Sequence, residues 1–132
     1  MKNTIYILFI FLVFSCEKKE NKLESILNKM ELRLSAENST TVERDENIKG
    51  LGFRRVLNID FINCKNIDLM DRSLKQEMRV MVIEIKNNIE GSENIDVYKV
   101  KLIKDPNDKT PTKSGLNIFE KGFTFNREEL FN

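Results

Sequence analysis

The spacing of apolar residues in three stretches of the chain limits the fold to a mixture of helices and strands. Across residues 74–89, apolar side chains recur every three or four positions, which places them on one side of a helix. Across residues 56–64, and again across 95–104, apolar and polar residues alternate as they do in a strand with one buried face. The sequence therefore predicts a helix over residues 72–88 between two strands.

The remaining segments extend this pattern. Apolar residues at helical spacing predict a first helix over residues 22–33, although the alternation over residues 30–36 also fits a strand. Residues 37–52 are polar and end with two glycines, which predicts a loop or hairpin turn. Residues 116–126 predict a last strand or tight hairpin, with Gly122 at a bend or bulge. Together they predict an α+β fold, a small, largely antiparallel sheet with two helices packed on one face.

The N-terminus carries a short apolar segment that ends in a cysteine. All residues from Ile5 to Phe14 are apolar, and Cys16 is followed at once by a run of charged residues. A helix of that length rises about 15 Å, half of the roughly 30 Å hydrocarbon core of a membrane. The segment is therefore too short to span a membrane and is typical of the apolar region of an export signal.

The residues Val-Phe-Ser-Cys that end at Cys16 resemble the lipobox of bacterial lipoprotein precursors. The resemblance implies that residues 1–15 are a cleaved signal peptide, and that residues 16–22 are a lipidated cysteine and tether. A single α+β domain then occupies residues 23–132. We therefore expect the protein to be anchored to a membrane of the bacterial cell envelope by lipid on Cys16, since more than one acyl chain gives stable anchoring.

Composition argues against several kinds of function. The chain has no histidine, which excludes His-based triads, imidazole general bases and the zinc sites that contain His. Removal of Lys2 with the signal would leave as many basic as acidic residues, so no net charge favours nucleic acid. We expect no metal or cofactor site. With Cys16 lipidated, Cys64 has no partner in the chain, and we interpret it as a small apolar core residue.

Two apolar residues of the predicted 72–88 helix do not fit its buried side. Val80 and Ile83 lie opposite the apolar arc, beside polar residues. Either the first helix covers them, which we prefer, or they belong to an exposed surface for a partner.

A row of lysines marks the predicted strand over residues 95–104. Lys99, Lys101 and Lys104 lie on it, and we interpret the row as a solvated sheet edge in preference to an anion site.

These observations favour a non-enzymatic interaction or accessory module of the envelope, with an unidentified protein partner. One alternative is an immunity-type lipoprotein that inhibits a toxin or lysis enzyme. Another is a hydrolase that uses carboxylates from different strands, which would require two buried carboxylates facing a deep pocket. The sequence singles out no catalytic residue and leaves the oligomeric state open.

Overall fold

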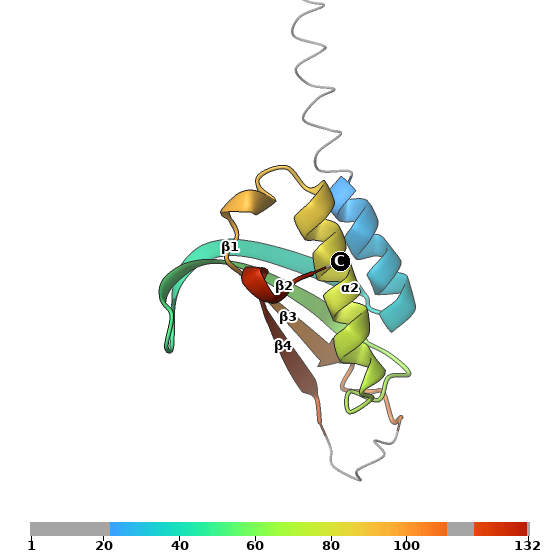
Figure 1. Ribbon diagram of the computed structural model, residues 1–132. Coiled ribbons are helices and arrows are strands. Elements are labelled where there is room, and N and C mark those ends of the chain that lie inside the picture. Colours follow the sequence, from blue (N-terminus) through green and yellow to red (C-terminus); the bar gives the residue numbers. More distant parts are fainter. Residues whose placement is uncertain (1–21, 111–117, 132) are drawn as a thin grey trace, which may run out of the picture.

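A computed structural model describes residues 22–110 and 118–131 of the protein (Figure 1). The first helix covers residues 22–34. The elements that follow it are β1 (Asn38–Ile48), β2 (Gly52–Cys64), α2 (Ser73–Asn88), the short 3-10 helix η1 (Ser92–Asn94), β3 (Val97–Lys104), β4 (Glu120–Asn126) and the 3-10 helix η2 (Arg127–Glu129). The predicted α+β class is confirmed.

The strands form one mixed sheet in the order β1-β2-β3-β4. The pairings of β1 with β2 and of β3 with β4 are antiparallel, whereas β2 and β3 are parallel. Parallel neighbours need a crossover connection, and α2 supplies it by returning the chain from the end of β2 to the start of β3. The sheet is therefore largely antiparallel, as predicted.

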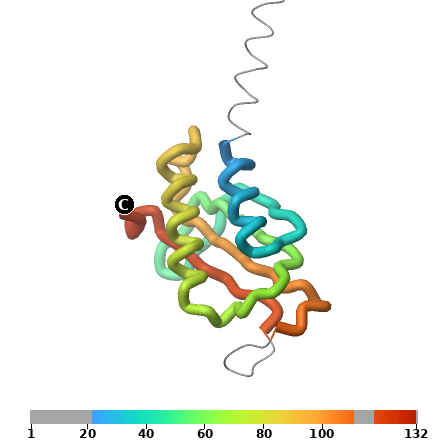
Figure 2. The backbone as a smooth tube through the Cα atoms, turned by 90° about the vertical axis from the view of Figure 1, so that its right-hand side faces the viewer, coloured from blue at the N-terminus to red at the C-terminus, as the bar shows by residue number. Residues whose placement is uncertain are grey.

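Both helices pack on the same face of this sheet, side by side (Figures 1 and 2). Alternate side chains of β2 and β3 point toward them, because successive residues of a strand face opposite sides. Most apolar residues of the predicted 74–89 arc are buried in the core, whereas Ile89 is partly buried and packs against it. The core includes Leu74, Met78, Met81, Val82 and Ile85 of α2, Ile59 and Phe61 of β2, and Tyr98, Val100 and Leu102 of β3.

The prediction of a loop over residues 37–52 was wrong for most of that segment. Residues 38–48 form β1, which pairs along its whole length with β2. β1 lies at the end of the strand order and most of its side chains are exposed, so its sequence lacks apolar alternation. The expected hairpin turn is present at its end, where Gly50 and Gly52 have φ of 85° and 75°.

The prediction of a bend or bulge at Gly122 was also wrong. β3 and β4 pair without a register shift, and Gly122 stands directly opposite Lys101. The irregularity in this part of the sheet lies between β2 and β3, where the register shifts between Phe61 and Cys64. None of the helices in the described part of the chain is both long and apolar enough to cross a membrane.

Candidate functional site

No described helix covers the face of the sheet that points away from the first helix and α2 (Figures 1 and 2). Most side chains on this face are polar, although the buried Val56 and Val97 also lie on it. We call it the outer face. The strand registers place side chains from all four strands on it. Its residues include Thr40, Val42, Arg44 and Glu46 of β1, Asn58 and Asp60 of β2, Lys99 and Lys101 of β3, and Gly122 and Thr124 of β4.

A shallow pocket of about 240 Å³ lies in the middle of the outer face. Residues of all four strands line it, and the charged ones are Arg44, Asp60, Lys99 and Lys101. Asp60 is the one carboxylate among the described residues that line the pocket. The pocket therefore offers several hydrogen-bond donors around a single acidic group.

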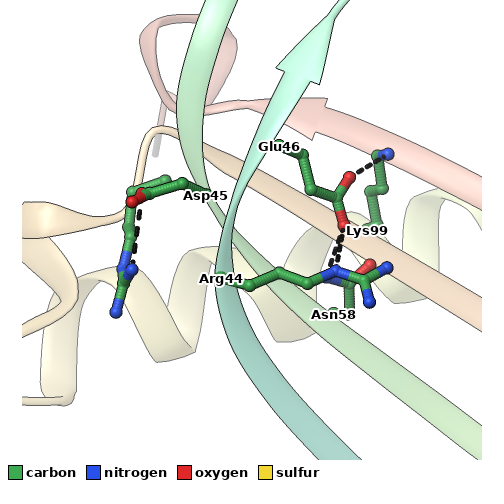
Figure 3. Close-up of polar contacts among 6 residues, drawn as sticks. Arg44, Asp45, Glu46, Asn58 and Lys99 are labelled. Carbon is green, nitrogen blue, oxygen red and sulfur yellow. Dashed lines mark hydrogen bonds and ion pairs between the residues drawn. The ribbon is translucent and has the colours of Figure 1, made fainter.

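Glu46 binds the side chains of Arg44 and Lys99 beside this pocket (Figure 3). Its carboxylate accepts hydrogen bonds from Lys99 Nζ at 2.6 Å, from Arg44 Nε at 2.7 Å and from Asn58 Nδ2 at 3.0 Å. The Glu46 side chain is only 15% exposed, so these bonds hold three strands together in a partly sheltered place. The hydrogen bond from Lys99, followed by those from Arg44 and Asn58, lowers the pKa of Glu46 to about 2. Glu46 is therefore an anion at any physiological pH.

Other polar groups of the pocket make few contacts with described residues. Lys101 and Asp60 are opposite each other in the β2–β3 register, yet within residues 22–110 and 118–131 they form no ion pair. Arg44 uses Nε for Glu46, and its Nη1 and Nη2 atoms bond to no other described residue. The arrangement suits recognition of a charged group.

The predicted lysine row is divided between the two faces of the sheet. Lys99 and Lys101 are on the outer face, but Lys104 points to the other side and is only 6% exposed. Its Nζ donates to the Thr110 carbonyl at 2.8 Å and lies 3.8 Å from the Asp108 carboxylate. β3 is also an inner strand of the sheet. The interpretation of this row as a solvated edge was therefore wrong, because β3 has a neighbour on both sides and Lys104 is buried on the face that packs against the helices.

Of the two cysteines, Cys64 lies in the described part of the chain. Cys64 is fully buried, and its Sγ donates to the Phe61 carbonyl at 3.7 Å. Burial raises the pKa of the Cys64 thiol to about 11, so it is protonated and a poor nucleophile at neutral pH. This supports its interpretation as a core residue. Cys16 lies outside the described residues.

Val80 and Ile83 have different surroundings on α2. Ile83 is partly buried and packs against the core, whereas Val80 is 55% exposed. The first helix does not cover Val80, although two ion pairs join that helix to α2 nearby: Arg33 with Glu77, and Lys29 with Glu84. A single exposed valine is ordinary on a protein surface. The outer face is the better organised candidate.

Sequence reasoning found only part of this candidate site. The alternation of β2 already directs Asn58 and Asp60 away from the core. The sequence gives no comparable signal for Arg44 or Glu46, because the segment that contains them resembles a polar loop.

Within the described ranges, no three His, Cys, Asp or Glu side chains are grouped so that they could hold a metal ion. No protein-family model, curated protein or solved structure matches this chain.

Proposed function

We propose that the protein is a lipid-anchored binding module of the bacterial cell envelope, and that a partner protein docks on the outer face of its sheet. The observation that carries the proposal is the Glu46 network. It fixes the side chains of Arg44, Asn58 and Lys99 on a face that no described helix covers. Side chains that are already ordered lose less conformational entropy on binding, so a fixed charge pattern favours recognition.

The content of the pocket favours binding over hydrolysis. Carboxylate-dependent hydrolysis of the kind considered above needs two acidic groups at one pocket, in the roles of acid and base or nucleophile. Of the described residues that line the outer-face pocket, Asp60 alone has a carboxylate, and the nearby Glu46 is occupied by three donors.

Site-specific crosslinking in native membranes tests this proposal. A photoreactive residue at Thr40, which is exposed on the outer face beside Asp60, should yield one discrete adduct with a protein partner. The matched position is Lys75, which is exposed on α2, and that helix packs on the other face of the sheet. We expect no adduct of that mass from Lys75.

The same adduct from both positions, or none from Thr40, would contradict the proposal. Glu46→Gln should reduce the Thr40 adduct, because an amide no longer holds Lys99 and Arg44 by charge. An undiminished adduct in a folded Glu46→Gln protein would show that the Glu46 network does not contribute to docking.

A further inference from the structure

Gly122 has no role in the fold that explains a glycine. It lies within β4 in regular register, and its φ is not in the left-handed region. A Cβ atom added there would meet no other atom within 4 Å, so no close approach requires its absence. A glycine inside a strand weakens the strand because it packs no side chain and loses more entropy on folding. Gly122 lines the outer-face pocket, and its missing side chain leaves that pocket open.

The charges around this opening select the ligand. The pocket and its network hold three cations, Arg44, Lys99 and Lys101, and two anions, Glu46 and Asp60, which leaves one net positive charge. One carboxylate balances that charge. The two negative charges of a phosphate dianion would exceed the net charge of the pocket. Arg44 presents its two terminal nitrogens, an arrangement that suits a carboxylate with its two oxygens.

We propose that the space over Gly122 receives an acidic side chain, Asp or Glu, of the partner protein. Its carboxylate pairs with Lys101 and with the terminal nitrogens of Arg44, and a neighbouring N–H of the partner donates to Asp60. This inference rests on the proposed function and adds the chemistry that the outer face recognises.

The test is a titration of the 15N-labelled full chain in detergent micelles, followed by NMR. The probe is acetyl-Gly-Glu-Gly-amide, and the controls are acetyl-Gly-Gln-Gly-amide and inorganic phosphate. We expect the Glu probe to cause saturable shifts at the amides of Lys101, Gly122 and Thr124. The Gln probe and phosphate should cause none that saturate in the same range.

Three variants make the test specific. Gly122→Val fills the opening and should weaken binding of the Glu probe while leaving the spectrum of the fold intact, since nothing lies in the way of the new side chain. Lys101→Gln should weaken binding about tenfold or more, the usual effect of losing a charge-assisted bond. The matched control is Lys121→Gln, because Lys121 lies opposite Leu102 on the other face of β4 and should leave binding unchanged.

Several outcomes would overturn the inference: no saturable shift, equal binding of the Gln probe, unchanged binding by a folded Gly122→Val protein, or equal losses in Lys101→Gln and Lys121→Gln. Tighter binding of phosphate than of the Glu probe would also reject a carboxylate site. The proposed function fails separately, because a Thr40 adduct that persists without any binding of the Glu probe would leave the outer face as a docking surface of different chemistry.

Discussion

At the residue scale, Glu46 shows how a surface carboxylate can become part of the fold. An exposed ion pair usually contributes little, because water screens the charges and two long side chains lose freedom. Glu46 differs because its three donors come from three neighbouring strands and its own side chain is largely sheltered. The network therefore ties three strands of the curved sheet together and also fixes the positions of Arg44 and Lys99 on the outer face.

The lowered pKa of Glu46 predicts a specific acid sensitivity. A carboxylate whose pKa is lower in the folded state contributes stability above its ordinary pKa, and this contribution is lost as the pH falls toward the folded value. For Glu46 that window runs from the ordinary value of 4.5 down to about 2. Thermal melts followed by circular dichroism should show a smaller loss of Tm over this window for Glu46→Gln than for the wild type.

Glu120→Gln is the control for that experiment, since Glu120 is an exposed carboxylate of β4. Its melts should follow the wild type through the acid range. Parallel pH profiles for wild type and Glu46→Gln would contradict the assignment of the acid sensitivity to Glu46.

At the scale of elements, substitutions in α2 should distinguish its core positions from its surface positions. Met78 and Ile85 are buried against the sheet, so Met78→Ala or Ile85→Ala should lower the free energy of unfolding by about 2 to 5 kcal/mol. Val80 is mostly exposed, and Val80→Ala should change the free energy of unfolding by no more than about 0.5 kcal/mol. Urea denaturation measures all three. A loss for Val80→Ala as large as that for Ile85→Ala would show that Val80 is covered.

The elements that could be predicted are those that bury one face in the core. α2 and β3 were correct to within about two residues because burial imposes a periodicity that the sequence displays. β1 buries little, and its place depends on hydrogen bonds to β2 that no side-chain pattern records. The outer face was missed for the same reason, since half of its Glu46 network comes from β1.

The parallel pairing of β2 with β3 illustrates a second limit. Alternation tells which face of a strand is buried, but not which strands are neighbours or in which direction they run. The Gly122 prediction failed in the same way. A glycine in a strand predicts an irregularity when only the backbone is considered, yet here the irregular register lies between β2 and β3.

At the scale of the whole molecule, the predicted lipid anchor at Cys16 would set where the domain works. We predict that Cys16 is acylated and is the first residue of the mature protein, because an apolar segment precedes it and charged residues follow at once. Mass spectrometry of the membrane fraction should find a lipid-modified peptide that begins at Cys16. Cys16→Ser should abolish both cleavage and lipid, and a lipid-free mature chain from the wild type would contradict the prediction.

The free edge of β1 has a consequence for proteins held close together. Among the described strands β1 pairs with β2 alone, so its other side exposes backbone N–H and C=O groups. An edge strand of another molecule can form hydrogen bonds with such groups, and repeated pairing of this kind builds filaments. Molecules confined to the plane of a membrane would meet edge to edge far more often than in solution. Glu43, Arg44, Asp45 and Glu46 stand in the middle of that edge. On a membrane surface these charges would oppose such polymerisation and favour separate copies of the domain.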